Sequence, residues 1–371
     1  MATVTPWEVK GNIDYDKLIR EFGVKPMPKL PPAFMENVLF RRNLIYAQRD
    51  FEKILEAIKK KKPFVMITGL MPSGKFHFGH KMIAEQMIFY QKLGAKVYIC
   101  VADVEAYNTR NTDTAQLRDT AINEYLLNYV ALGLDLSQCD FYFQSNRSLD
   151  GRKASAYYRL ASMLSRHATF NEFQAVYGEI TPAKMSSSLL QASDMCHAQM
   201  PEFEGPMPVV IPVGIDQDPH VRLARDMIQR FKAVPMEQIS STYNKFCPGL
   251  GGGKMSSSDP TTHIALTETP QEAAKKINKY AFSGGQATVE EHRRLGGNPE
   301  VDVAFQMLLY GLEPDDDKLA QIYQDYKSGK MLSGELKKYC IDKVSTFLEK
   351  HHKKRSQAQK IVTKFLKETG N

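Results

Sequence analysis

The chain of 371 residues is long enough for two or three domains, and its composition, with 43% hydrophobic and 25% charged residues, is typical of a folded globular protein. It has no apolar run of about 20 residues and no secretory signal pattern at its start, which argues against a membrane or secreted protein. The five cysteines form no CxxC pair, and the net charge of +7 permits an acidic partner without identifying one. We expect a cytoplasmic protein with no membrane contact, no DNA partner and no dedicated metal site.

Residues 1–58 are predicted to form a mixed, partly helical extension. Its clearest element is a helical pattern at residues 50–58, followed by four lysines at residues 59–62. The helix dipole favours lysines at the end of a helix, and such runs are usually solvated. A contact with RNA is the alternative interpretation of this run.

From residue 63 onward the sequence predicts alternating strands and helices. The predicted strands cover residues 64–68, 96–102, 140–144 and 209–213, and the predicted helices cover residues 77–93, residues 114–132 and the segment after Pro219. This alternation predicts an α/β fold with a parallel, doubly wound sheet of the Rossmann type. Residues 146–200 have a helical pattern and would form an insertion. We expect the α/β domain to span residues 59–266 and an all-helical domain to span residues 267–371.

The first motif, PSGKFHFGH at residues 72–80, lies between a predicted strand and a predicted helix. In a doubly wound sheet this loop lies where ligands bind, and the helix N-terminus attracts phosphate. His77 and His80 are one helical turn apart and can both donate to phosphoryl oxygens, while Gly79 permits close approach of a nucleotide. Two histidines that only cap the helix are the alternative. The candidate nucleotide ligands are Ser73, Gly74, Lys75, His77, Gly79 and His80.

The second motif, GGGKMSSSDP, covers residues 251–260. A lysine on a glycine-flanked loop can neutralise charge that develops on a transferring phosphate. A disordered polar loop is the alternative. The candidate catalytic residues here are Lys254, Met255, Ser256, Ser257 and Ser258. The same five letters at residues 184–188 lack flanking glycines and precede the strand at 209–213, so we expect that copy to lead into a helix that lines the pocket.

The third motif, IPVGIDQDP at residues 211–219, again joins a strand to a helix. Gly214 permits close approach of a ligand to the backbone, and the Asp216 carboxylate can accept a hydrogen bond from a ribose hydroxyl. Asp218 before Pro219 is a good helix N-cap. The capping role of Asp218 and ribose binding by Asp216 are compatible.

Together, the early HxGH and the late KMSSS are the paired signature of the class I aminoacyl-tRNA synthetases. Nearly the whole chain, except about residues 27–36, resembles the tryptophanyl-tRNA synthetases of the archaeal and eukaryotic branch. The matching segments are TPWEV at 5–9, IDYDKL at 13–18, IDQDP at 215–219, AFSGG at 281–285, EEHR at 290–293, EPDDD at 313–317 and LSGELK at 332–337. The resemblance implies a homodimer that activates L-tryptophan with ATP and Mg2+ and transfers it to tRNA(Trp). It also implies that residues 267–371 bind the anticodon.

The expected amino-acid pocket departs from that branch. Ile67 stands where the branch usually has a tyrosine, and Cys100 stands where it has a glutamine; both usual residues address the indole N–H. A buried donor without a partner costs about 1–3 kcal/mol, so another acceptor is needed. Asp194 resembles the aspartate that accepts the indole proton in bacterial tryptophanyl enzymes, and an exposed or capping carboxylate is the alternative. The expected tryptophan contacts are Ile67, Glu105, Gln191, Asp194 and Gln217.

Other families share parts of this pattern. Tyrosyl-tRNA synthetases hold the phenol with an aspartate at the place of Asp194, together with a tyrosine that this chain lacks at Ile67. Small nucleotidyltransferases have an HxGH-like turn but are shorter and lack the second motif. A non-catalytic, synthetase-like RNA-binding paralogue would be expected to have a damaged nucleotide motif, whereas all three motifs are intact.

The tail carries ten basic residues between Lys337 and Lys367, with few acidic residues among them. Such a segment either forms a solvated helix or contacts RNA phosphates. The residues expected to contact tRNA are Lys353, Lys354 and Arg355.

Overall fold

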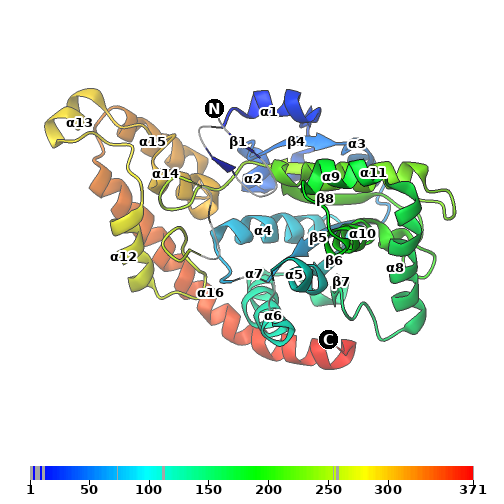
Figure 1. The fold of residues 1–371 in the computed structure, drawn as a ribbon. Helices are drawn as coiled ribbons and strands as arrows, with labels where there is room; N and C mark the ends of the chain where they lie inside the picture. Colours follow the sequence, from blue (N-terminus) through cyan, green and yellow to red (C-terminus); the bar gives the residue numbers. More distant parts are fainter. Residues whose placement is uncertain are drawn as a thin grey trace.

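A computed structural model describes residues 3–4, 9–10, 13–72, 74–110, 113–253, 255 and 259–370. Its centre is a seven-stranded sheet in the order β3–β4–β9–β8–β5–β6–β7 (Figure 1). The strands of this sheet are β3 (Lys25–Pro26), β4 (Ile45–Arg49), β5 (Phe64–Leu70), β6 (Ala95–Val101), β7 (Cys139–Phe143), β8 (Val209–Gly214) and β9 (Ser240–Asn244). A separate antiparallel pair consists of β1 (Thr3–Val4) and β2 (Val9–Lys10).

The strands β9, β8, β5, β6 and β7 run parallel, whereas β4 is antiparallel to β9 and to β3. On one side β5 pairs with β6, the next of these strands in sequence, and on the other side it pairs with β8, from much later in the chain. The strand order therefore reverses between β5 and β8. The register of these two strands covers only residues 65–66 and 209–210 and ends before their carboxyl halves. Ligands of doubly wound sheets bind at such a switch point.

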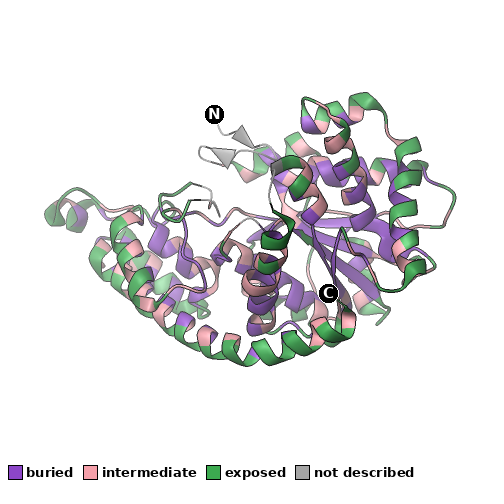
Figure 2. Cartoon of the chain, turned by 60° about the horizontal axis from the view of Figure 1, so that its bottom comes forward, coloured by how far each residue is buried: buried purple, intermediate pink, exposed green. Residues whose placement is uncertain are grey.

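Helices cover both faces of the sheet, so nearly all residues of its central strands are buried (Figure 2). Met66 faces the core that contains α4, and its neighbours Val65 and Ile67 face the core formed with α8, α10 and α11. The helices of this part are α3 (Glu52–Lys59), α4 (Phe78–Lys92), α5 (Asp103–Arg110), α6 (Thr114–Thr120), α7 (Leu127–Leu132), α8 (Gly151–Leu164), α9 (Phe170–Tyr177), α10 (Pro182–Cys196) and α11 (Asp218–Arg230).

The chain ends in helices, the last of which is long (Figure 1). A stripe of α16 from Leu336 to His351 is buried, and its residues recur at spacings of three or four. This stripe is the face of the helix that packs on other helices. Besides α12, α16 packs against α7 of the α/β part. The helices of this part are α12 (Pro270–Tyr280), α13 (Val289–Leu295), α14 (Val303–Met307), α15 (Asp316–Lys327) and α16 (Ser333–Thr369).

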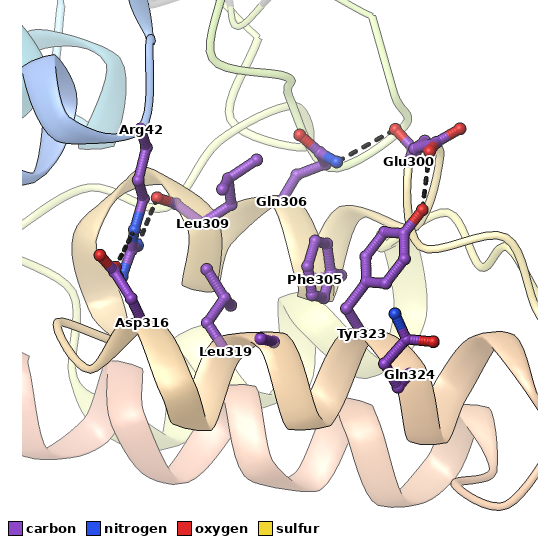
Figure 3. A pocket seen from close by; sticks show the side chains of 10 residues that line it. Arg42, Glu300, Phe305, Gln306, Leu309, Asp316, Leu319, Tyr323 and Gln324 are labelled. Atoms are coloured by element: carbon purple, nitrogen blue, oxygen red, sulfur yellow. Dashed lines mark hydrogen bonds and ion pairs between the residues drawn. The ribbon is translucent and has the colours of Figure 1, made fainter.

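A second attachment of the helical part runs through Arg42, which follows α2 (Val38–Arg41). Its Nε donates to Oδ1 of Asp316 at 2.8 Å, and its Nη1 donates to the carbonyl of Leu309 at 2.7 Å (Figure 3). These groups line a hollow of about 400 Å3 whose other walls include Phe305 and Tyr323. Because α14 and α15 supply most of this lining, the hollow is separate from the switch point.

The predicted α/β fold is confirmed, and the predicted strands and the first helix agree with β5, α4, β6, β7 and β8 to within two residues. The helix predicted at 114–132 is wrong in one respect, because a π-helical turn, Ala121–Leu126, separates α6 from α7. The strand β9 was not predicted. Its sequence, SSTYN, is buried but polar, so it lacks the apolar run that indicates a buried strand. Within the described residues, no helix combines the length and apolar character needed to span a membrane.

Candidate active site

The loop from β5 to α4 holds two histidines in a defined tautomer. Nδ1 of His77 accepts the N–H of Gly79 at 3.1 Å, and Nδ1 of His80 accepts the N–H of His77 at 3.2 Å. A ring nitrogen that accepts a hydrogen bond carries no proton in a neutral imidazole, so both rings carry their proton on Nε2. The rings stack with centroids 3.9 Å apart. His77 therefore caps the helix, and this contact is compatible with an Nε2–H that donates to a ligand.

Both imidazoles are neutral at physiological pH. Burial lowers the pKa of His77 to about 2, helped by the neighbouring His80 and His263, and burial with His263 lowers the pKa of His80 to about 3. A neutral ring can donate a hydrogen bond to a phosphoryl oxygen but adds no positive charge. Charge on a bound triphosphate must therefore be balanced by other groups.

The second motif lies against the first. A Cβ built on Gly79 would stand 3.5 Å from Sδ of Met255, and Ala265 forms a β-bridge with His77. The N–H of Leu266 also donates to the carbonyl of Phe76 at 2.8 Å. Met255 of the KMSSS run and residues 265–266, which follow the run, are thus brought to the start of α4. The other predicted members of these motifs, Lys254, Ser256, Ser257, Ser258 and Ser73, lie outside the described residues.

The third motif follows β8, beside β5. A Cβ on Gly214 would overlap the Asp216 carboxylate, so the glycine is needed for this side chain to fold back over the strand end. Asp216 is buried and accepts a hydrogen bond from Gln217 Nε2 at 3.0 Å. The predicted capping role of Asp218 is wrong. Its buried carboxylate belongs to the first residue of α11 and pairs with Nε of Arg49 at 2.7 Å.

Asp194 is buried on α10 and accepts hydrogen bonds from three side chains. Its Oδ1 accepts the hydroxyls of Tyr142 and Tyr157, each at 2.8 Å, and its Oδ2 accepts Nε2 of Gln144 at 2.7 Å. Burial raises the pKa of Asp194, although these donors and the Cys100 thiol act in the opposite direction. The alternative of an exposed or capping carboxylate is contradicted.

Three of the other residues expected to bind tryptophan, Ile67, Glu105 and Gln191, lie near Asp194 and its hydrogen-bond donors. Ile67 and Cys100 share a core with residues of α10. Oε1 of Gln144 accepts the N–H of Glu105 at 3.1 Å, which ties the start of α5 to Asp194. Gln191, one turn before Asp194, accepts the hydroxyl of Tyr177 at 3.3 Å. Gln217 donates its side-chain amide to Asp216.

Residues 59–349 match the family model of the class I tRNA synthetases for tryptophan and tyrosine (W and Y). The chain belongs to this family. The tryptophan–tRNA ligase of Aeropyrum pernix is 45% identical to it over 97% of each chain, and that of Methanocaldococcus jannaschii is 44% identical over 99% of this chain and 98% of its own. These relatives place the chain in the archaeal type of tryptophanyl-tRNA synthetase.

Solved structures agree with this family membership. The tryptophanyl-tRNA synthetase of Aeropyrum pernix superposes with a TM-score of 0.89, at 44% identity over 95% of this chain and 96% of that one. The enzyme from Encephalitozoon cuniculi, solved bound to tryptophan, gives 0.82 at 25% identity over 95% and 97% of the two chains. The Rossmann-type fold predicted from the sequence is that of the family.

The second KMSSS copy, residues 184–188, is helical, as predicted. It lies in the first half of α10, where Lys184 Nζ donates to the carbonyl of Glu179 at 2.7 Å and Ser187 is buried. The same helix carries Gln191 and Asp194 in its second half. The lysine of this copy is therefore part of the scaffold that positions the predicted pocket residues.

Tyr142, Gln144 and Tyr157 were not among the site residues predicted from the sequence. Two of them were open to detection, because Tyr142 and Gln144 stand at the carboxyl end of a predicted strand, where ligand-binding side chains of such sheets gather. Tyr157 lies on α8, and nothing in its sequence neighbourhood distinguishes it from a core residue.

Two of the three predicted tRNA contacts are exposed. Lys353 and Lys354 lie on the outer face of α16, whereas Arg355 is half-buried and its Nη2 donates to the carbonyl of Asn123. Arg355 therefore attaches α16 to the π-helical turn.

Proposed function

We propose that the chain activates L-tryptophan with ATP and transfers it to tRNA(Trp) at the carboxyl ends of β5 and β8. Tryptophan–tRNA ligase activity is that of curated relatives which are 42–45% identical and cover at least 97% of the chain. One observation supports this location: Met255, residues 265–266 and the end of β8 lie near the start of α4 at the switch point. We propose residues 59–266 as the catalytic domain and residues 267–371 as the anticodon-binding domain, with residues 1–58 as an extension.

In the first step, a carboxylate oxygen of tryptophan attacks the α-phosphorus of ATP, the bond to the bridging oxygen breaks, and pyrophosphate leaves. The Nε2–H groups of His77 and His80 would donate to phosphoryl oxygens, and the N-terminus of α4 would add its dipole. Because both rings are neutral, Lys254 and Lys75 would supply the positive charge. Gly74 and Gly79 would allow the phosphates to approach the backbone, and Asp216 behind Gly214 would accept a ribose hydroxyl.

We propose that Mg2+ enters with ATP. In the described part of the chain, no group of three or more His, Cys, Asp or Glu side chains is arranged to hold a metal ion. Mg2+ retains several waters and is commonly bound through substrate phosphates. An ion held by the phosphates of ATP would therefore need no cluster of protein ligands. The ion would neutralise phosphate charge, and the protein would contribute His77, His80 and Lys254 around it.

For the amino acid, we propose that Asp194 accepts the indole N–H while Ile67 packs against the ring. A carboxylate has about four acceptor positions, and two phenols and one amide already address three of them. The indole N–H would take the remaining position. Glu105, Gln191 and Gln217 would face the polar end of the substrate.

Three further proposals follow from family membership. tRNA would be bound in part by the exposed Lys353 and Lys354, with Arg355 holding the helix that carries them. The enzyme would be a homodimer in the cytoplasm, where tRNA is charged.

The direct test is ATP–pyrophosphate exchange with each of the twenty amino acids, followed by aminoacylation of tRNA(Trp). We expect exchange that depends on tryptophan and charging of tRNA(Trp). Exchange that depends on tyrosine would overturn the choice of substrate and favour the tyrosyl alternative. Absence of exchange with any amino acid would favour a non-catalytic RNA-binding paralogue.

A further inference from the structure

The π-helical turn, Ala121–Leu126, lies between the nucleotide loop and α16. The N–H of Leu127 donates to the carbonyl of Ile122, five residues back, so the α-helical pattern is interrupted there. The carbonyls of Asn123 and Glu124 accept side-chain hydrogen bonds, from Arg355 of α16 and from Asn128 respectively. Single π-helical turns within α-helices occur frequently at functional sites.

One face of this turn supports the nucleotide loop. Oε1 of Glu124 accepts Nζ of Lys75 at 2.5 Å, and Oε2 accepts the N–H of Phe76 at 3.5 Å. The next residue, Tyr125, packs its ring edge-on against Phe76 at 5.5 Å and against His80 at 5.1 Å. The turn thus contacts the two residues before His77 and the ring of His80.

The opposite face is bonded to α16 through a directional chain. Asn128 donates its amide to the carbonyl of Glu124, so its Oδ1 points to Nε2 of His351, 2.7 Å away. The amide oxygen is only an acceptor, so His351 must carry its proton on Nε2. Burial lowers the pKa of His351 to about 4, which keeps this ring neutral. Each hydrogen bond in the chain has one possible direction.

A second contact leads from α16 to the same motif. Phe347, one turn before His351, stacks on that ring at 5.6 Å and lies 5.4 Å from the ring of Phe78. Phe78 stands between the two histidines of HxGH and is buried. The segment of α16 around residues 347–355 therefore contacts the nucleotide loop directly and through the π-helical turn.

We propose that Glu124 is a positioning residue for the nucleotide loop, and that α16 acts on the loop through His351, Asn128 and Glu124. The carboxylate holds Lys75 and the Phe76 amide in the positions that the phosphates of ATP require. Because Lys353 and Lys354 lie on the same segment of α16, a phosphate backbone bound there would shift the loop through this chain. The inference rests on the proposed function, which places ATP at this loop.

The test is the split between KM for ATP and KM for tryptophan in pyrophosphate exchange. Glu124→Gln keeps the size of the side chain but removes its charge, and we expect KM for ATP to rise about tenfold with KM for tryptophan unchanged. Glu56→Gln is the matched control. Glu56 is also a helix glutamate paired with a lysine, Lys60, but lies on α3. An unchanged KM for ATP in Glu124→Gln overturns the proposal.

The role of α16 is tested with two substitutions of His351. Leucine breaks the chain and should raise KM for ATP about threefold, whereas glutamine can still donate to Asn128 and should restore it. In the double variant with Glu124→Gln, the leucine should add nothing further, because His351 acts on the loop through Glu124. Equal KM for ATP in the leucine and glutamine variants, or additive effects in the double variant, contradicts the chain.

These two experiments remain informative if Glu124→Gln does not fold, because the His351 variants leave the loop residues intact. They also separate this inference from the proposed function. If the wild-type chain shows no tryptophan-dependent exchange, the proposed function fails. If exchange is present and both Glu124→Gln and His351→Leu leave KM for ATP unchanged, only the positioning role fails.

Discussion

The proposed nucleotide end of the site is formed by groups close in sequence, whereas the proposed amino-acid end is formed by side chains from distant elements. At the nucleotide end, His77 and His80 are oriented by backbone N–H groups of the same turn. At the amino-acid end, β7, α8 and α10 each contribute to the cluster around Asp194. A short motif can therefore specify the first end, but only the complete fold assembles the second.

Their electrostatics also differ. Burial keeps the histidines of the proposed nucleotide end neutral, so lysines would have to supply positive charge there. The amino-acid end buries a carboxylate and surrounds it with hydroxyl and amide donors. Under the proposed function, one end would stabilise a charge that moves during the reaction, and the other would provide a fixed hydrogen bond that selects the substrate.

The largest expected effect is at the nucleotide end. Lys254→Ala should slow adenylate formation by about 100-fold or more while barely changing tryptophan binding, because the lysine acts mainly on charge that develops in the transition state. Lys184→Ala is the matched control, since the same five-residue sequence surrounds it in α10. Single-turnover kinetics of adenylate formation measures both. Equal losses in the two variants would show that the wrong copy has been assigned.

Substitution at the proposed amino-acid end should change KM for tryptophan. Asp194→Asn should raise KM for tryptophan by about 10- to 100-fold, because a hydrogen bond to a charged acceptor contributes about 1.5–3 kcal/mol. Asp302→Asn is the control. Asp302 is also buried and accepts a tyrosine hydroxyl, from Tyr326 at 2.8 Å, but it lies in the helical part. That control should lower stability and leave KM unchanged. A normal KM in a folded Asp194→Asn enzyme would refute the assignment.

Acid should affect the two ends in opposite directions. The pKa values of His77 and His80 are lowered, so the unfolded chain binds protons first and stability falls below about pH 6.5, by up to about 1.4 kcal/mol per pH unit for each ring. The pKa of Asp194 is raised, so there the folded chain binds a proton first and stability gains. The free energy of unfolding, measured with denaturant between pH 7 and 4.5, should fall less steeply with decreasing pH in His80→Gln than in the wild-type chain. It should fall more steeply in Asp194→Asn. Identical slopes would contradict both assignments.

The smallest effect concerns tRNA. Replacing Lys353 and Lys354 together by alanine should weaken tRNA binding severalfold and reduce the slope of log K against log salt by about one to two, with pyrophosphate exchange unchanged. Substitution is preferable to truncation because α16 buries Val344, Leu348 and His351. A variant in which Lys60 and Lys61 are both replaced by alanine tests the alternative RNA contact at residues 59–62. Weaker binding in that variant alone would move the tRNA surface away from α16.

The sequence predicted the α/β fold, its switch-point loops and the pairing of HxGH with KMSSS, because these depend on local patterns of apolar residues, glycines and histidines. It did not predict β9, whose residues are buried but polar, or the ion pair between Arg49 and Asp218. It also missed Tyr157 and Glu124. Their partners, Asp194 and Lys75, are 37 and 49 residues away in the chain, and only the packing of α8 on α10 and of the π-helical turn on the loop brings them together.

The most direct test of the account compares tryptophan with an analogue whose indole nitrogen is replaced by sulphur, in ATP–pyrophosphate exchange. If Asp194 accepts the indole N–H, the analogue leaves a buried acceptor without that donor, and kcat/KM should fall by about tenfold or more. In Asp194→Asn the difference between the two substrates should largely disappear. Equal kcat/KM for tryptophan and the sulphur analogue in the wild-type enzyme would contradict the account, because no protein group would then recognise the N–H.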